Sequence, residues 1–180
     1  FNDVKFKVDN FTKKNMLLIE SLWEDITQAI TTTIKLISNF GFNRDTLTSA
    51  NTLIPIAYYL LKLEANDSFI YQQQWEKQRE QIRQWLIRVL LKRTFSGTPD
   101  NLYPQLRKLI NEANGEFPLG AIIDFYRGTN KSIIFTEDDI NTLLETEYSS
   151  KYVFATLALL YPELNLTHIF HLDHIFPKKY

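Results

Sequence analysis

The feature of this sequence that most constrains its fold is a spacing of three and four between apolar residues. Between Thr12 and Asn39 these residues are Met16, Ile19, Trp23, Ile26, Ile30, Ile34 and Ile37. Such a spacing is the period of a helix with one buried face. Thr12 is suited to the N-cap of that helix, and Gly41 to its end. We therefore expect one long first helix that buries this stripe.

The same pattern predicts about seven helices in all, followed by a short strand. After the first helix, the expected helices cover residues 50–64, 69–95, 102–114, 119–126, a segment that starts at Thr136, and 151–161. The second of the seven, 50–64, is apolar nearly all round and should be central, with Pro55 in its first turn. Only 166–176 favours an extended chain. The expected fold is all-α, with a single helical domain over residues 1–165 and a strand within 166–180.

Composition narrows the class of protein. Glycine and proline together number 5 + 6 = 11 of 180 residues, and 44% of the residues are hydrophobic, which excludes disordered and collagen-like chains. The net charge of −1 gives no global basic field, so any DNA site must be local. The apolar runs are too short to cross a bilayer, so we expect no membrane association. The absence of cysteine fits a reducing compartment, and we expect a cytoplasmic protein.

All three histidines lie near the end of the chain, beside one carboxylate. They are His168, His171 and His174, and the carboxylate is Asp173. A divalent ion held by Asp173 could polarise a phosphodiester while neutral His174 takes a proton from water. The alternative is a structural histidine bonded to a backbone carbonyl beside a capping aspartate. A zinc site made of the three histidines would need a helix here, which the surrounding Ile and Phe residues disfavour.

These residues resemble a known motif. The string His171-Leu172-Asp173-His174-Ile175-Phe176-Pro177 resembles the start of the HNH, or ββα-metal, nuclease motif. The preceding helical region resembles GmrSD-type modification-dependent restriction endonucleases of bacteria. The segments that carry this likeness are Leu53-Ile54-Pro55-Ile56, Ile82-Arg83-Gln84-Trp85-Leu86 and Phe95-Ser96-Gly97.

The resemblance implies a metal-dependent DNA endonuclease of the restriction or phage-defence type. Asp173 would be a ligand of Mg²⁺ or Mn²⁺, His174 the general base, and His171 a neighbour of the site. The partners would be DNA, modified or not, an N-terminal ParB-like domain and the rest of the HNH domain. Neither the second strand and helix of the motif nor a DGQQR-like string occurs in this sequence. We expect a helical connector with half a catalytic motif, cut from a longer protein, inactive alone and without a tightly bound metal ion.

The alternative hypothesis is that the chain is a helical module that binds protein or DNA, with structural histidines and no catalysis. For DNA, the basic residues of the expected helix 69–95 are informative. Its first half should form ion pairs from Glu76 to Arg79 and from Glu80 to Arg83. The candidates for contact with the DNA backbone are therefore the exposed cations of its second half and of the tail. These are Arg88, Lys92, Arg93, Lys178 and Lys179.

Aromatic residues are the last candidate feature. Tyr58, Tyr59, Tyr71, Tyr103 and Phe125 could stack an extruded base, as base-flipping proteins do. Helical cores use the same residues to fill volume. Of the two interpretations we favour core packing.

Overall fold

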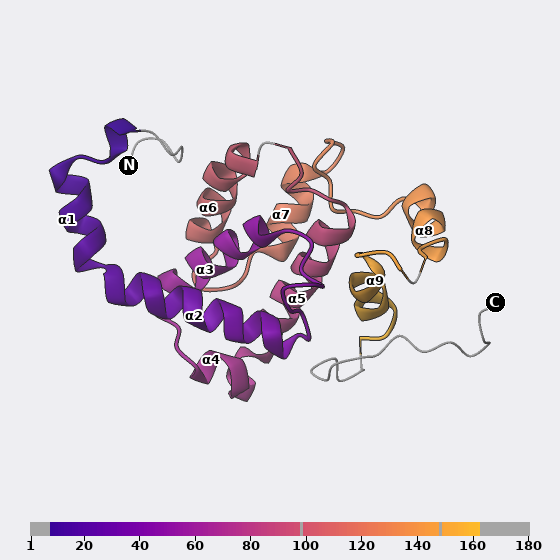
Figure 1. Cartoon of the computed structure of the whole chain (residues 1–180), viewed down its shortest axis with the longest axis horizontal. Helices are drawn as coiled ribbons and strands as arrows, with labels where there is room; N and C mark the ends of the chain where they lie inside the picture. Colours follow the sequence, from indigo (N-terminus) through magenta and orange to yellow (C-terminus); the bar gives the residue numbers. More distant parts are fainter. Residues whose placement is uncertain (1–7, 98, 148, 163–180) are drawn as a thin grey trace.

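A computed structural model describes residues 8–97, 99–147 and 149–162, and over these residues the chain is all-helical, without a strand (Figure 1). The α-helices are α1 (Lys13–Ser21), α2 (Trp23–Asn39), α3 (Leu53–Lys62), α4 (Ser68–Tyr71), α5 (Glu76–Leu91), α6 (Tyr103–Glu112), α7 (Leu119–Tyr126), α8 (Glu137–Leu144) and α9 (Val153–Leu160). Short 3-10 turns, η1 to η4, cover Val8–Asn10, Ala50–Thr52, Gln73–Trp75 and Pro99–Asn101. The prediction of an all-α fold is confirmed for the described residues.

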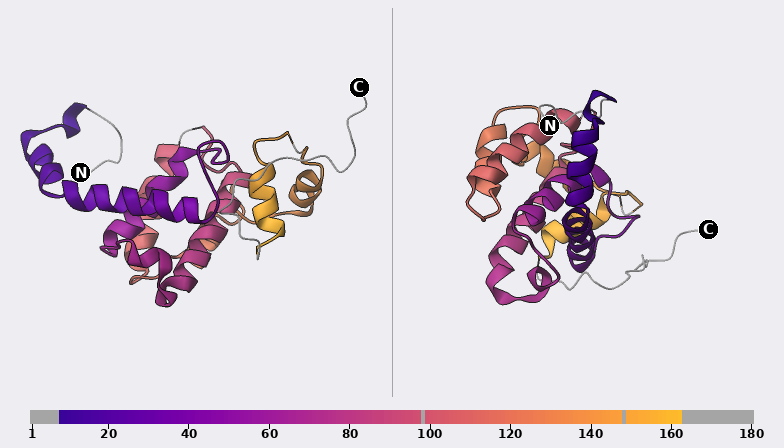
Figure 2. Two further views of the ribbon diagram at one scale, coloured as in Figure 1. Left: turned by 60° about the horizontal axis from the view of Figure 1, so that its bottom comes forward. Right: turned by 90° about the vertical axis from the view of Figure 1, so that its left-hand side faces the viewer.

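The core is built around α5. This helix packs against α7 and α9, and the neighbouring α3 packs against α2 and α6. Figures 1 and 2 show α5 among these helices, with α1 reaching away from them. Trp85 is 1% exposed, and its ring meets the rings of Phe95 and Phe117 edge-on at 5.9 and 5.8 Å. The helical spacing of the expected helix 69–95 predicts an inward face made of Trp75, Ile82, Trp85, Leu86, Val89 and Leu90. The last five are buried as predicted, whereas Trp75, in η3, is only half-buried.

The prediction of a central apolar helix is confirmed by α3. Pro55 lies in its first turn, where a missing backbone N–H costs no helical hydrogen bond. Buried Tyr59 donates its hydroxyl hydrogen to the Gly115 carbonyl at 2.9 Å, and its burial raises the pKa of the hydroxyl. Gly115 adopts φ +92°, a conformation that favours glycine, just after the end of α6.

The prediction of one long first helix is only partly correct. Its start and end are confirmed, because the Thr12 hydroxyl accepts from the Asn15 N–H at 3.2 Å and Gly41 adopts φ +87° beyond the end of α2. However, the helix is broken at Leu22, which has φ −103° and ψ 8°. The expected buried stripe is also wrong for most of its length. The buried residues of α2 are Ala29, Thr32, Thr33, Leu36 and Ile37.

A different face of α2 is buried because α3 and α4 pack where its side chains are small. Ala29 and Thr33 permit close approach, and the Thr33 hydroxyl donates to the Ala29 carbonyl at 2.8 Å, so its burial leaves no unpaired hydroxyl hydrogen. The larger residues of the expected stripe lie beside this face. Ile37 is the one member of that stripe that is fully buried.

The expected helix 69–95 is also divided, into α4, η3 and α5. The chain becomes extended at Gln72, with ψ 136°. The Arg79 guanidinium donates to the carbonyls of Phe69 and Gln72 at 2.8 and 2.7 Å, and so satisfies acceptors that a helix end leaves open. With both divisions, the seven expected helices become the nine α-helices of the described residues.

The C-terminal predictions are confirmed as far as the described residues extend. The bounds of α7 are those expected, and Thr136 caps α8 in a reciprocal capping box with Asp139. The predicted strand within 166–176 and the boundary at 165/166 lie outside the described residues. No helix of the described part is long and apolar enough to cross a membrane.

Candidate functional site

The residues to which the sequence assigns catalysis lie beyond the described part of the chain. This applies to His171, Asp173 and His174, and to the tail lysines Lys178 and Lys179. Among residues 8–97, 99–147 and 149–162, no group of three or more His, Cys, Asp or Glu side chains could hold a metal ion. The candidate metal site therefore stays a prediction for the tail, and the structure describes the surface from which the tail continues.

That surface is a polar hollow of about 860 Å³ at the N-terminal half of α5. Its lining residues come from η3, α5, the end of α2 and the end of α9. They are Phe40, Gln73, Gln74, Glu76, Lys77, Arg79, Glu80, Arg83 and Pro162. Pro162 is the last described residue, so the chain continues towards the histidines from the rim of this polar hollow.

Two arginines of the polar hollow, Arg79 and Arg83, donate hydrogen bonds to other groups of the chain. Arg83 is 14% exposed, pairs with Glu80 at 2.9 Å and donates to the Ala158 carbonyl at 3.3 Å. Burial alone would raise the pKa of Glu80, but hydrogen bonds from Arg83 and Gln84 lower it overall. The predicted Glu80–Arg83 pair is thus confirmed. The predicted Glu76–Arg79 pair is wrong, because Arg79 donates to the carbonyls at the break after α4.

Lys77 is the accessible cation of the polar hollow. It pairs with Glu116 at 2.9 Å, but the two side chains are 63% and 58% exposed, and such ion pairs contribute little because water screens them. A bound anion could therefore replace Glu116 as the partner of Lys77 at little cost in free energy. The amides of Gln73 and Gln74 are exposed nearby. The polar hollow thus offers hydrogen-bond donors and one exchangeable cation to an anionic ligand.

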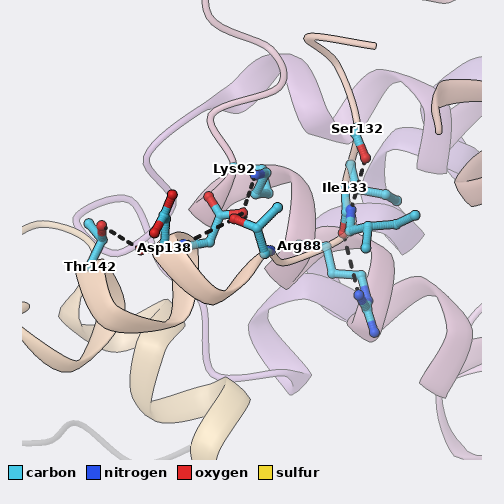
Figure 3. Close-up of polar contacts among 9 residues, drawn as sticks. Arg88, Lys92, Ser132, Ile133, Asp138 and Thr142 are labelled. Carbon is cyan, nitrogen blue, oxygen red and sulfur yellow. Dashed lines mark hydrogen bonds and ion pairs between the residues drawn. The ribbon is translucent and has the colours of Figure 1, made fainter. Parts of the chain in front are cut away.

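Arg88 and Lys92, predicted to be exposed DNA contacts, are engaged within the protein (Figure 3). Lys92 Nζ lies 2.6 Å from Asp139 Oδ2, with the two side chains only 20% and 27% exposed. Arg88 donates to the Ile133 carbonyl at 3.4 Å and lies over the Phe135 ring. The expectation of exposure is wrong for both, because their charges fasten the segment 132–144 to α5.

The carboxylate that pairs with Lys92 also organises α8. Asp139 Oδ2 accepts from the backbone N–H and the hydroxyl of Thr136, each at 2.8 Å. The hydrogen bond from Lys92, followed by that from the Thr136 N–H, lowers the pKa of Asp139. One carboxylate therefore both caps α8 and joins it to α5.

Arg93 differs from Arg88 and Lys92. Its side chain is exposed, its backbone adopts φ +51°, and its guanidinium lies 4.5 Å over the ring of Tyr152. Stacking on an aromatic face leaves the N–H groups at the edge of the guanidinium free to donate. Of the three basic residues predicted on α5 and just after it, Arg93 is thus the one whose geometry suits a phosphate contact.

The five candidate aromatic residues do not form one pocket. Core packing is confirmed for Tyr59, whereas Tyr71 is 74% and Phe125 50% exposed, on α4 and α7. Tyr58 and Tyr103 do lie together, in a pocket of about 180 Å³ between α3 and α6. The remaining lining of this pocket is Ile54, Pro55, Leu106, Arg107 and Ile110.

We compared the chain with protein-family models and with curated proteins. The chain matches no protein-family model and no curated protein. The likeness to GmrSD-type nucleases therefore rests on the residues quoted for it above. Sequence reasoning missed the polar hollow, although a signal was present: the run Gln72-Gln73-Gln74 interrupts the apolar spacing just before Trp75.

Proposed function

We propose that this chain is the helical connector and first catalytic segment of a metal-dependent DNA endonuclease of the HNH type. The observation that carries the proposal is the string His171-Leu172-Asp173-His174-Ile175-Phe176-Pro177. Asp173 would hold Mg²⁺ or Mn²⁺, His174 would accept a proton from the attacking water, and His171 would be a neighbour of the site. A neutral imidazole can do this near pH 7 because its ordinary pKa is about 6.5.

The polar hollow supports this proposal through its position and its chemistry. His174 follows Pro162 by 12 residues. A chain of that length spans at most about 43 Å, which limits how far His174 can lie from Pro162 in the lining of the polar hollow. DNA held at Lys77, and at Arg93 further along the chain, would be close to the active segment. A net charge of −1 for the whole chain permits such a local site.

The test of this proposal is a cleavage assay. Because the motif needs a second strand and a helix, the assay uses a chain extended beyond Tyr180 by about forty to sixty residues, enough for two elements and their loops. We expect double-stranded DNA to be cut with Mg²⁺ or Mn²⁺, and not with EDTA. His174→Ala should reduce the rate by about 10²- to 10⁴-fold, the usual contribution of a positioned general base.

A matched control is His168→Ala in the same extended chain. His168 is in the same tail but outside the string, so its loss should leave cleavage unchanged. Full activity of His174→Ala would remove His174 as the base. An extended chain that cuts no DNA with either metal ion would contradict the proposed endonuclease.

A second function is supported by a separate observation, the exposed apolar residues of α1 and α2. In this reading the chain is a helical module that binds another protein chain, and its histidines are structural. Trp23 is 60% exposed and Leu17 55%, which is unusual for side chains of this size on a water-facing helix. An extended chain without nuclease activity that associates through these residues would favour this function over the first.

A further inference from the structure

Two cations that are distant in the sequence lie over one aromatic ring. The guanidinium carbon of Arg93 is 4.5 Å from the centroid of the Tyr152 ring, and Lys151 Nζ is 5.3 Å from the same centroid. The two cations are therefore at most about 10 Å apart, the sum of these distances. They meet because Arg93 follows α5 closely, Tyr152 directly precedes α9, and these two helices pack together (Figures 1 and 2).

Neither cation is neutralised by a carboxylate of the part of the chain that the structure describes. Arg93 and Lys151 are both exposed, and neither forms an ion pair there. This distinguishes Arg93 from Lys92, whose charge is already paired with Asp139. Because the two like charges repel each other, an anionic ligand that contacts both is favoured over one that contacts either alone.

The turn that carries Arg93 is held in place by hydrogen bonds. The Arg93 N–H donates to the Leu90 carbonyl at 3.2 Å. Lys131 Nζ donates to the carbonyls of Thr94 and Ser96 at 2.8 and 3.1 Å. The Arg93 side chain therefore extends from a fixed backbone, so little ordering is left to occur when it binds a ligand. The ammonium of Lys131 adds a third positive charge to this region of the surface.

We propose that Arg93 and Lys151 bind two phosphates of one DNA strand, and that Tyr152 is the positioning residue for both. This inference rests on the proposed function, which makes DNA the ligand. Successive phosphates of a strand follow one another by about 3.4 Å along the axis, so two cations no more than about 10 Å apart can contact neighbouring phosphates at once. Such contacts hold the duplex in place without reading its sequence.

The two side chains suit different parts of this task. A guanidinium stacked on a ring keeps the N–H groups at its edge free to donate to phosphate oxygens, and its plane is fixed by the ring. The Lys151 ammonium is a compact charge on a flexible stem, which can follow the second phosphate.

Fluorescence anisotropy of the chain with a short labelled duplex, in EDTA, tests the site. Lys151→Gln should reduce the slope of log affinity against log salt by about 0.9, and the double variant with Arg93→Gln by about 1.8. The matched control is Lys108→Gln on α6, an exposed lysine whose contact with Glu112 is long, at 3.9 Å. This control should leave the slope unchanged.

The positioning role of Tyr152 is tested by removing the ring and by keeping it. Tyr152→Leu should weaken DNA binding by about twofold to fivefold, the equivalent of one exposed contact between a cation and a ring. Its slope should stay nearly unchanged, because both charges remain. Tyr152→Phe keeps the ring and should bind as the original chain does, which a merely structural loss in Tyr152→Leu would not predict for the slope. Circular dichroism verifies that α9 is retained.

The same measurements contain the results that would overturn the site. These are a chain that does not bind the duplex at low salt, an unchanged slope for Lys151→Gln, or a double variant that loses no more than Arg93→Gln alone. Calorimetry with inorganic phosphate separates DNA from a small anion, and saturable binding of phosphate at micromolar concentration would assign the site to the latter.

Failure of this site and failure of the nuclease give different results. Cleavage by the extended chain together with an unchanged slope for Lys151→Gln would remove the phosphate site and keep the nuclease. A reduced slope without cleavage would keep the phosphate site and remove the nuclease.

Discussion

Helices α2 and α5 are nearly equal in length, with 17 and 16 residues, yet their apolar patterns have different outcomes. In α5 the residues expected to face inward are buried. In α2 the expected stripe is largely exposed, and a neighbouring face of alanine, threonine and leucine is buried. This difference shows that an apolar stripe identifies a surface suited to packing. Whether the chain buries that surface depends on where the other elements of the fold lie.

Two tryptophans provide the strongest test of this contrast. Trp85→Ala should destabilise the fold by about 3–5 kcal/mol, because it empties a space between Phe95 and Phe117. Trp23→Ala, at a side chain that is 60% exposed, should change stability by no more than about 0.5 kcal/mol. Urea unfolding followed by circular dichroism measures both. Equal losses in the two variants would mean that Trp23 is buried against the helical body after all.

A second comparison stays within α2. Leu36 is fully buried and Ile34, two residues earlier, is 55% exposed. Leu36→Ala should therefore cost about 2–5 kcal/mol, whereas Ile34→Ala should stay within about 0.5 kcal/mol. The same urea titration separates them. A larger loss for Ile34→Ala would reverse the assignment of the two faces.

The connection between α5 and α8 should contribute less than either core residue. Lys92→Met removes a partly buried, charge-assisted hydrogen bond to Asp139, which we expect to cost about 1–2 kcal/mol after allowance for solvent screening. Amide hydrogen exchange should rise in α8 and remain slow in α3. Lys108→Met is the control, because its contact with Glu112 is at 3.9 Å and exposed. Unchanged exchange in α8 would show that this hydrogen bond does not fasten it.

This connection also predicts a dependence on pH. The pKa of Asp139 is lowered in the folded chain, so the stability that the carboxylate contributes is complete above its unfolded pKa of about 3.9. It is lost as the pH falls through the lower, folded value. Asp139→Asn should therefore weaken α8 at pH 7, and its effect should be smaller at a pH below about 3.9, where this contribution begins to be lost. Exchange rates in α8 at both pH values measure this, and an equal effect at both would contradict it.

The smallest expected effect concerns DNA binding by the end of α5. Arg93→Gln should reduce the slope of log affinity against log salt by about 0.9, the contribution of one phosphate contact to B-DNA. Loss of the stacking on Tyr152 should lower stability by no more than about 1 kcal/mol. Fluorescence anisotropy with a labelled duplex at several salt concentrations measures the slope. The control is Arg107→Gln on α6, an exposed cation at the Tyr58–Tyr103 pocket. An unchanged slope for Arg93→Gln would exclude that phosphate contact.

Local signals predicted several boundaries well. Thr12, Gly41, Pro55 and Thr136 act where residue chemistry indicated, because caps, prolines and glycines with positive φ depend on a few neighbouring residues. The breaks at Leu22 and Gln72 were missed because no breaker residue marks them. At Gln72 the acceptors are satisfied by Arg79, from the next helix.

The candidate functional residues show the same contrast between local signals and contacts distant in sequence. Asp173 and His174 are adjacent in the sequence, so their pattern could be recognised directly. The contact of Lys92 with Asp139 spans 47 residues, and nothing in the sequence around Lys92 indicates it. The prediction of exposed phosphate contacts at Arg88 and Lys92 failed for this reason.

The sequence by itself determined that the described residues are helical and where several of their helices begin and end, and it predicts which residues could carry metal-dependent chemistry. These properties follow from the helical period and from contacts between residues a few positions apart. The tertiary structure decided which face of α2 is buried, which cations of α5 are already bonded, and that a polar hollow lies where the chain continues past Pro162. Those outcomes depend on elements distant in sequence, whose arrangement a local apolar pattern does not specify.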